Sequence, residues 1–365
     1  MLLKDIRVLD LSTLLPGPLC SMILADLGAE VIKIESLQGD MMRIFECQFF
    51  KALNRNKKSI AMNLKENDGK KIVKRLAKNA DVILEGFRPG KLDSLGLGYS
   101  EIKKINHDII YCSITGYGQK GKNKDKAGHD LNYSALSGML HMTNGKPIVP
   151  MVQIADVSSA LVAAFSIVAS LLQRERSGKG DYIDVSIFNS ALAFIGIHLA
   201  KYSSNQSFNQ TLSGNTPCYN IYKTKDGKYI SLGAVEQKFW ESFCKSISRK
   251  DLLKKQFDRH SLLEMRNVFK SKTLKEWMGL NSRFDFCCEP VKTVDAVIRD
   301  NKESVVILER TAQVTFPVAF RSFKVKYNKS PKLGEDTNEV LASIGYGKRV
   351  IRMLKSKKVV YDGKP

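Results

Sequence analysis

Two side chains that can move protons, those of His129 and Asp156, stand 27 positions apart in one stretch of the chain. His129 belongs to a Gly-His-Asp turn, and Asp156 directly precedes Val157–Gln173, a run without a charged residue. Each therefore stands at the edge of a predicted regular element, where functional sites are commonly built. The same pattern also fits two structural roles, a helix-capping Asp156 and a hydrogen-bonded turn residue at His129.

Two βαβ patterns and a further strand precede this stretch. Apolar runs of strand length alternate with segments of helical spacing, which predicts an α/β fold. The first turn lacks the GxGxxG pattern of dinucleotide-binding proteins, so the topology alone does not indicate a dinucleotide. The predicted strands are Ile6–Leu11, Val31–Glu35, Ser59–Asn63, Asp81–Glu85 and Ile109–Thr115, and the predicted helices are Leu19–Leu27 and Asn67–Lys78.

Arg88 lies in the segment Gly86-Phe87-Arg88-Pro89-Gly90, directly after the strand Asp81–Glu85. Ligands of open α/β sheets bind beyond the carboxyl ends of the strands. Arg88 is therefore predicted to contact a phosphate or carboxylate, and a solvated turn arginine is the alternative. Gly116-Tyr117-Gly118 follows the next strand, where small residues permit close approach of a ligand or a neighbouring chain.

The pattern of the chain changes after the central stretch. Two apolar helices are followed by short strands and aromatic-rich helices, which predicts a smaller second domain. The tail is expected to form one amphipathic helix after a capping Asp336-Thr337, and the Lys-rich run from Lys348 to Lys364 is expected to be solvated or frayed. The later predicted helices are Val157–Arg174, Val185–Ala200, Ser261–Lys270 and Thr273–Leu280, and the later predicted strands are Cys218–Lys223 and Tyr229–Leu232.

Composition limits the kinds of partner. The chain has 365 residues, of which 43% are hydrophobic, and 58 Lys and Arg against 37 Asp and Glu give a net charge of +21. The basic residues are scattered, without the aromatic-interleaved motifs or zinc-finger spacing of nucleic-acid modules. A small ligand that bears phosphate is enough to explain the charge, so neither nucleic acid nor a membrane is expected as a partner.

The seven cysteines show no CxxC pair and no regular spacing, which argues against a zinc site or a disulfide framework. The residues after Met1 include no apolar signal-peptide region, and Val157–Gln173 is shorter than the ~20 residues of a membrane span. The sequence therefore predicts a soluble, cytoplasmic protein.

Nine ordered segments resemble the family III CoA-transferases and, within them, the α-methylacyl-CoA racemases. The resemblance covers nearly the whole chain. The segments are PGPLCSMILADLGAEVIKIE, EGFRPGKLDSLGLG, SITGYGQ, AGHDLNYSALSG, IADVSSA, RSGKGDYIDVS, DGKYISLGAVEQKFW, CCEPV and PKLGEDTNEVLASIGY.

The resemblance implies an α/β architecture with a Rossmann-like large domain built from both termini and a smaller α+β domain, in an intertwined homodimer. The expected divisions are residues 1–200 for the N-terminal part of the large CoA-binding domain, 201–224 for a linker, 225–320 for the small domain, and 321–365 for the return to the large domain. An acyl-CoA is the expected substrate, and no cofactor is expected because the CoA moiety belongs to that substrate.

Catalytic roles are implied for three residues. The Asp at position 156 is shared by both branches, as the nucleophile of the transferases or as one acid/base group of the racemases. His129, in GHDLNY, matches the racemases specifically, and Glu236 matches their third catalytic residue. The residues expected to bind the CoA moiety are Arg88, Lys33, Gly86, Phe87, Tyr117 and Tyr133.

Two departures accompany the resemblance. Ser36 stands where the racemases tend to have a basic residue that contacts CoA, so Lys33 or Arg43 is expected to take that part. Asn215 stands in LSGNTPCY where a second Gly is usual.

Inversion of a carbon next to a thioester needs two opposed acid/base groups and stabilisation of the enolate. The N–H groups at the predicted helix start, those of Asp156 or Val157, are expected to bind the thioester oxygen, and Glu236 is expected to orient His129. The sequence thus predicts a racemase of 2-methyl-branched acyl-CoA thioesters. A CoA-transferase with Asp156 as nucleophile and a basic binding protein without enzyme activity are the alternatives.

Overall fold

The structure is a computed structural model that describes residues 1–142, 147–203 and 212–363. It divides into two compact units. Unit 1 contains Met1–Met139, Val149–Phe194 and Lys302–Pro365, and unit 2 contains Leu140–Ile148 and Ile195–Asn301. The first unit thus includes segments from both ends of the chain.

The predicted domain boundaries differ from these units in several segments. Leu140–Ile148 and residues 195–200, predicted in the large domain, fall within unit 2. The described part of the predicted linker, 201–224, falls within unit 2, and its residues 204–211 lie outside the described residues. Residues 302–320, predicted in the small domain, fall within unit 1, where β10 (Val305–Leu308) and β11 (Thr311–Val314) form a hairpin.

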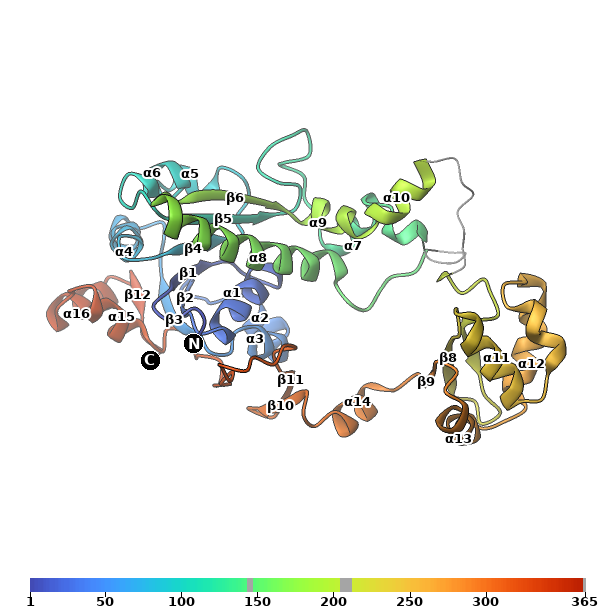
Figure 1. Cartoon of the computed structure of the whole chain (residues 1–365). Helices are drawn as coiled ribbons and strands as arrows, with labels where there is room; N and C mark the ends of the chain where they lie inside the picture. Colours follow the sequence, from blue (N-terminus) through green and yellow to red (C-terminus); the bar gives the residue numbers. More distant parts are fainter. Residues whose placement is uncertain (143–146, 204–211, 364–365) are drawn as a thin grey trace. The chain divides into compact units, whose positions relative to one another are not determined.

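Unit 1 is built on a seven-stranded sheet (Figure 1). Its strand order is β12-β3-β2-β1-β4-β5-β6, and every pair is parallel except β12 with β3. The order reverses between β1 and β4, which makes the carboxyl ends of these two strands the place where such sheets bind ligands. The strands are β1 (Arg7–Leu11), β2 (Glu30–Glu35), β3 (Lys58–Met62), β4 (Val82–Glu85), β5 (Ile110–Thr115), β6 (Asp181–Ser186) and β12 (Val360–Tyr361).

Helices cover both faces of this sheet because neighbouring residues of each strand point to opposite sides. Val8 of β1 packs in the core with α1 (Pro16–Asp26) and α8 (Ile154–Ser177). Leu9 packs in a second core on the opposite face. The helices of that second core include α4 (Asn67–Ala77), α15 (Thr337–Ser343) and α16 (Lys348–Ser356).

Short helices occupy the connections of unit 1. They are α2 (Met42–Phe45), α3 (Cys47–Leu53), α5 (Lys91–Ser94), α6 (Tyr99–Lys103), α7 (Asp130–Leu136) and α9 (Ile187–Phe194).

Three predicted elements were wrong. The first helix does not begin after Pro-Gly-Pro but at Pro16, because proline lacks only an N–H that the first helical turn leaves unpaired anyway. The predicted helix Val185–Ala200 is the end of β6, then α9, then the start of α10 (Gly196–Ser203).

The C-terminal run is the third. It is not frayed up to residue 363, and only Lys364 of the predicted run lies outside the described residues. Ile351 and Leu354 of α16 are buried, and β12 adds an antiparallel edge strand to β3. Its lysines form the polar face of an amphipathic helix, which hid the apolar face in a composition-based prediction.

Unit 2 is a smaller α+β body. Its antiparallel sheet consists of β7 (Tyr219–Lys223), β8 (Tyr229–Gly233) and β9 (Cys288–Pro290). Aromatic rings fill its core, with Trp240, Phe243, Phe269 and Trp277 fully buried. The helices of this unit include α11 (Gln237–Ser246), α12 (Leu262–Lys270), α13 (Leu274–Phe284) and α14 (Val294–Asp300).

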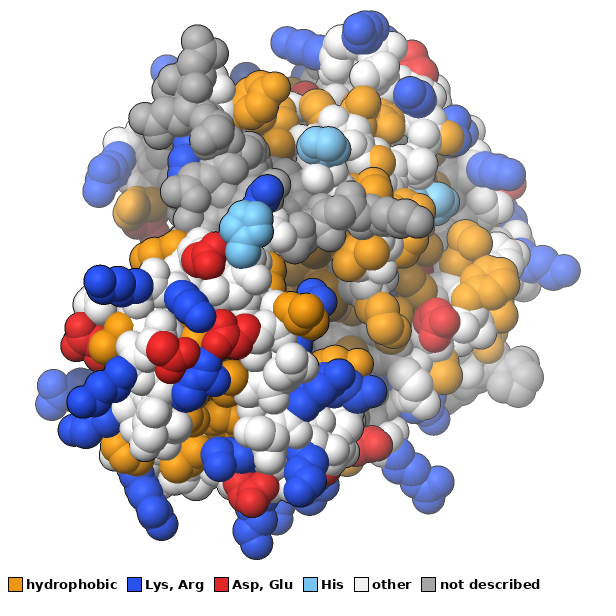
Figure 2. Space-filling view, turned by 90° about the vertical axis from the view of Figure 1, so that its right-hand side faces the viewer, with side chains coloured by type: hydrophobic (Ala, Val, Ile, Leu, Met, Phe, Trp, Pro, Cys, Tyr) orange, Lys and Arg blue, Asp and Glu red, His pale blue; other side chains and the backbone are white. Residues whose placement is uncertain are grey.

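Among the described residues, α8 is the one helix long and apolar enough to cross a membrane by length and composition. Core helices pass the same test, and half of its most apolar 18-residue window is buried. On the face drawn in Figure 2, Lys and Arg side chains are spread among acidic and apolar ones rather than gathered in one stripe.

Candidate active site

A cavity of about 470 Å³ opens where the strand order of unit 1 reverses. Its walls come from the segments that follow β1 and β4, which contribute Ser12 and Gly86, from Thr115 at the end of β5, and from the start of α8. The cavity thus occupies the position at which doubly wound sheets bind ligands.

His129 and Asp156 both line this cavity. His129 precedes α7, and its backbone N–H donates to Oδ1 of Asn132 at 3.0 Å, which fixes the turn that presents the imidazole. Asp156 lies in the first turn of α8 rather than directly before the helix, because α8 begins at Ile154. Two side chains that can carry protons, from different elements, therefore line the same cavity, and their catalytic roles stay a prediction.

The carboxyl group of Asp156 has a pKa close to 7. Burial and the negative charge of Asp130 raise its pKa from 3.8 to about 7. Its neighbour Tyr133 has a pKa raised to about 12, first by burial and then by the charge of Asp156. Burial thus outweighs the helix N-terminus, which would favour the carboxylate.

Asp130 is a site residue that sequence reasoning missed. Its Oδ1 accepts the backbone N–H of Asp156 at 3.0 Å, which ties the start of α7 to the start of α8. The same carboxylate is the charge that raises the pKa of Asp156. The only signal in the sequence is that Asp130 directly follows His129.

The predicted oxyanion donors are occupied. The N–H of Asp156 donates to Asp130, and the N–H of Val157 donates to the carbonyl oxygen of Gln153 at 2.9 Å. Neither is available to a thioester oxygen, so the prediction that they bind it was wrong. It failed because the helix begins three residues earlier than the sequence suggests, at Ile154 rather than at Val157.

Tyr133 lines the cavity, whereas Tyr117, also predicted to bind the CoA moiety, is not among the lining residues. The two rings pack edge to face, with ring centroids 5.2 Å apart. The hydroxyl of Tyr133 donates to the carbonyl oxygen of Gly128 at 2.7 Å. A Cβ at Gly116 would come within 2.4 Å of that hydroxyl oxygen. Tyr133 lines the cavity and Tyr117 supports it from behind, so the small residue at 116 makes room for a tyrosine ring.

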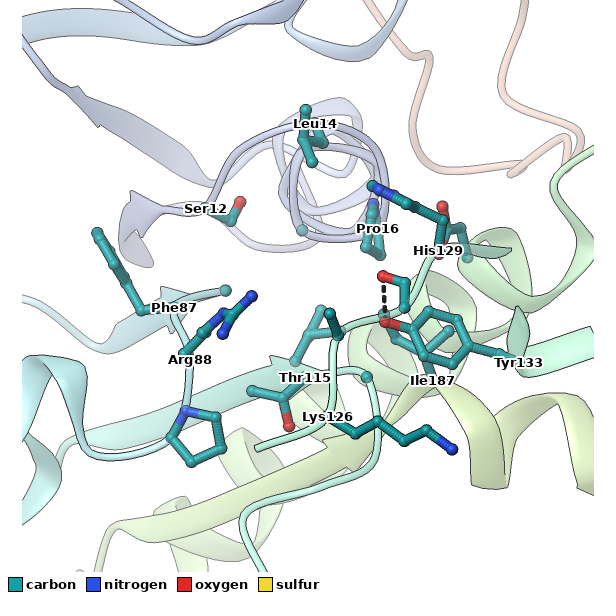
Figure 3. Close-up of a pocket in the computed structure, with 18 of the residues that line it drawn as sticks. Ser12, Leu14, Pro16, Phe87, Arg88, Thr115, Lys126, His129, Tyr133 and Ile187 are labelled. Carbon is teal, nitrogen blue, oxygen red and sulfur yellow. Dashed lines mark hydrogen bonds between the residues drawn. The ribbon is translucent and has the colours of Figure 1, made fainter. Parts of the chain in front are cut away.

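Arg88, Gly86 and Phe87 all line the cavity, as the GFRPG segment predicts. Figure 3 shows the Arg88 guanidinium extending from its loop, on the side of Ser12 and Thr115. Within the part of the chain that the structure describes, Arg88 makes no ion pair. Its charge is therefore available to an anionic ligand.

Three further lining residues were not expected. Lys124 and Lys126 add positive charge to the cavity lining. Thr115 is 5% exposed, and its hydroxyl has no hydrogen-bond partner among the described residues. A buried hydroxyl without a partner is uncommon in proteins, and a bound ligand would supply one.

Lys33 does not reach the cavity. Its side chain is fully buried, and Nζ pairs with Asp40 at 3.0 Å and donates to the carbonyl oxygen of Ser12 at 2.9 Å. Arg43 is also engaged, in a two-pronged ion pair with Glu35 at 2.7 Å. Neither residue replaces the basic CoA contact that Ser36 lacks, because both cations are already paired inside unit 1.

Glu236 belongs to unit 2. It is exposed and directly precedes α11. Unit 1 alone thus supplies His129 and Asp156, and the catalytic part of Glu236 stays a prediction. Asn215 also lies in unit 2, just before β7.

The described residues contain no cluster of potential metal ligands. No three His, Cys, Asp or Glu side chains in 1–142, 147–203 and 212–363 come together in a way that could hold a metal ion. All seven cysteines are free thiols.

Residues 3–337 match the family model described as CoA-transferase family III. The chain belongs to this family. Succinyl-CoA:glutarate CoA-transferase of Mus musculus is 35% identical over 376 residues, covering 94% of this chain and 86% of that protein. Alpha-methylacyl-CoA racemase of Homo sapiens is 33% identical over 391 residues, covering 100% of this chain and 99% of that protein.

The solved structure of a CAIB/BAIF family protein from Brucella suis has the same fold, with a TM-score of 0.84. It is 26% identical, and the match covers 94% of this chain and 99% of that one. The predicted family is thus confirmed, and so is an α/β fold with one large parallel sheet and small antiparallel sheets. The chain is an enzyme of a superfamily that acts on acyl-CoA.

Proposed function

We propose that the protein is a racemase that inverts the α-carbon of 2-methyl-branched acyl-CoA thioesters by two-base proton transfer. One group removes the α-proton, the electron pair moves into an enolate, and the opposite group returns a proton to the other face. His129 and Asp156 take these two parts and exchange them when the reaction runs backwards.

The observation that carries this proposal is the pKa of Asp156, raised to about 7 in the cavity that it shares with His129. A reversible racemase needs each group both as an acid and as a base at the same pH. General acid–base catalysis works best when the pKa lies near the operating pH. The Asp156 carboxyl meets that requirement, and an imidazole is the side chain most often used for general acid–base catalysis.

The rest of the cavity suits the CoA moiety. Arg88, Lys124 and Lys126 would face its phosphates, since charge-assisted hydrogen bonds from basic side chains are the usual phosphate contacts. The hydroxyl of Thr115 is available to a polar group of the substrate.

We also propose a homodimer in which Glu236 of one chain completes the site of the other and orients His129. The outer face of α8 supports self-association, because it carries four exposed apolar side chains at helical spacing. Their exposed fractions are 48% for Leu161, 64% for Phe165, 38% for Val168 and 50% for Leu172. An apolar stripe of this kind marks an interface more often than free surface.

A CoA-transferase is the second candidate, favoured by the 35% identity to succinyl-CoA:glutarate CoA-transferase. In that reaction the Asp156 carboxylate would attack the thioester carbonyl, the CoA thiolate would leave, and an acyl-aspartyl anhydride would form. A nucleophilic carboxylate must be ionised. A pKa near 7 leaves a large part of the Asp156 population protonated at neutral pH, which suits an acid/base group better than a nucleophile.

Incubation with each epimer of a 2-methylacyl-CoA ester in heavy water tests the proposal. A racemase incorporates one deuterium at C2 and leaves the thioester intact, and Asp156→Asn and His129→Ala each greatly slow the exchange. A transferase instead passes CoA to an added carboxylic acid and accumulates an Asp156 adduct that hydroxylamine traps. CoA transfer without exchange at C2 would overturn the racemase assignment.

A further inference from the structure

Four charged side chains form a buried quartet behind the cavity, and the proposed chemistry uses none of them directly. They are Asp10, Lys33, Asp40 and Lys57, and all four side chains are 0% exposed. Lys33 pairs with Asp40 at 3.0 Å, and Lys57 pairs with Asp10 at 3.1 Å. They come from β1, from β2, from the segment after β2 and from the residue before β3.

Three members of the quartet bond to one short segment, Ser12–Leu14, and the fourth, Lys57, holds Asp10. The Asp10 carboxylate accepts the backbone N–H of Ser12 at 2.9 Å and also its hydroxyl. Lys33 Nζ donates to the carbonyl oxygen of Ser12 at 2.9 Å. Asp40 Oδ1 accepts the N–H of Leu14 at 3.4 Å. Three backbone groups within three residues are thus held by buried charges.

This segment is a wall of the cavity, since Ser12, Thr13 and Leu14 all line it. Leu14 has a φ of 68°, in the left-handed region that leucine rarely adopts. A side chain in that region is retained only where the surroundings determine the conformation. The quartet helps to fix the backbone conformation of Leu14, because Asp40 accepts its N–H directly.

Stability does not explain the quartet. Buried ion pairs are often no more stabilising than apolar side chains of the same size, because desolvation opposes the attraction. Burial lowers the pKa of Lys57 to about 8 against the attraction of Asp10, which shows how strongly the site is desolvated. What apolar side chains could not supply is the set of bonds to the backbone of the wall.

We propose that Lys33 and Asp40, with Asp10 and Lys57, are positioning residues that hold the Ser12–Leu14 wall in the shape that binds the CoA thioester. They act through the backbone of the wall and do not touch the substrate. The inference rests on this cavity being the acyl-CoA site of the proposed function, and it holds for racemase or transferase chemistry alike.

The test replaces one pair by apolar side chains of similar size, Lys33→Met with Asp40→Leu, so that no single charge is left buried. The wall then populates its binding shape less often, and the apparent affinity falls by that fraction. We expect KM for the acyl-CoA, and the Kd of CoA measured by calorimetry, to rise on the order of tenfold, with kcat changed much less.

A matched control is the ion pair of Asp26 and Arg55, in the same unit. Arg55 Nη2 lies 2.6 Å from Asp26 Oδ2, and the two side chains are 3% and 0% exposed. Neither residue bonds to the wall in the described structure. Asp26→Leu with Arg55→Met should therefore leave KM unchanged. An equal rise in KM for both pairs would mean general loosening and would overturn the inference.

Leu14→Gly supplies the second arm, because glycine adopts a positive φ without strain. In that background the Lys33→Met, Asp40→Leu change should raise KM clearly less than in the wild type, since the wall no longer needs the same restraint. Additive effects would refute a link through Leu14. If the pair variant does not fold, Asp40→Asn alone should still raise KM about threefold, and an unchanged KM overturns the inference.

The outcomes separate this inference from the proposed function. A wild-type protein that binds no CoA thioester would remove the proposed site itself. If the wild-type protein binds the CoA thioester and the Lys33→Met, Asp40→Leu variant binds it equally well, only the positioning role is refuted.

Discussion

Asp156→Asn should make the protein more stable at neutral pH while greatly reducing its activity. In the folded chain the pKa of this carboxyl is raised from 3.8 to about 7, first by burial and then by Asp130. The unfolded chain therefore ionises Asp156 at lower pH than the folded chain does. The stability associated with the neutral carboxyl is complete below pH 3.8 and is lost as the pH rises to about 7. Asparagine does not ionise, so the variant escapes that loss.

The size of the effect can be worked out from the shift. A shift of about three pKa units corresponds to ~4 kcal/mol, at 1.36 kcal/mol per unit. Asp156 is only partly buried, so solvent screening reduces this figure, and ~2 kcal/mol is a reasonable expectation. For a unit of this size that gain corresponds to about 4–8 °C in Tm. The gain should grow between about pH 4 and pH 7 and stay constant above that.

Thermal unfolding of both proteins at several pH values measures this. The control is Asp125→Asn, an exposed aspartate on the same cavity, which should change Tm little at any pH. A variant no more stable than the wild type at pH 8 would refute the raised pKa. So would a gain of the same size at pH 4.5 and pH 8, because ionisation of Asp156 would then not be its cause.

The remaining predictions concern the ligand, the partner chain and the pH profile. Arg88→Ala should raise KM for the acyl-CoA far more than it lowers kcat, and a fall in kcat alone with unchanged CoA affinity would exclude a binding role. Chains with Glu236→Gln and chains with His129→Ala, unfolded and refolded together, should regain activity if the site is shared, and proven heterodimers without recovery would count against it. Asp130→Asn should lower the pKa of Asp156, because it removes a neighbouring negative charge. In the reaction direction that needs protonated Asp156, kcat should then decline at a pH about one unit lower than in the wild type, which a profile of kcat against pH measures.

Strands and helices with a clear period were predictable from the sequence because each buries a continuous apolar face. The predicted strand Val31–Glu35 differs from β2 by one residue, and Asp81–Glu85 differs from β4 by one. One failure came where polar side chains hid the pattern. In α16 basic residues surround the buried Ile351 and Leu354, and a prediction by composition gave the basic residues more weight than the spacing of the apolar ones.

The site was predictable where it depends on the residues directly after a strand, and not where it depends on pairing between distant side chains. Arg88 comes shortly after β4, and the carboxyl ends of parallel strands meet at one edge of the sheet. Lys33 was expected to replace the basic contact missing at Ser36, and only the folded chain shows that Asp40 returns to pair with it. Asp130 was missed for the same reason, since its bond to Asp156 joins residues 26 positions apart.

The choice between the two chemistries of this family depends on the surroundings of one carboxyl group. A nucleophilic Asp156 would need positive charge or several hydrogen-bond donors, which keep a carboxylate ionised. The structure instead places a second carboxylate, that of Asp130, against the backbone of Asp156. Asp130 accepts the Asp156 N–H and adds negative charge next to the Asp156 carboxyl. Both effects disfavour the ionised form of Asp156. A carboxyl group so placed exchanges protons near pH 7. The inversion that we propose would use His129, which lines the same cavity, as its second group.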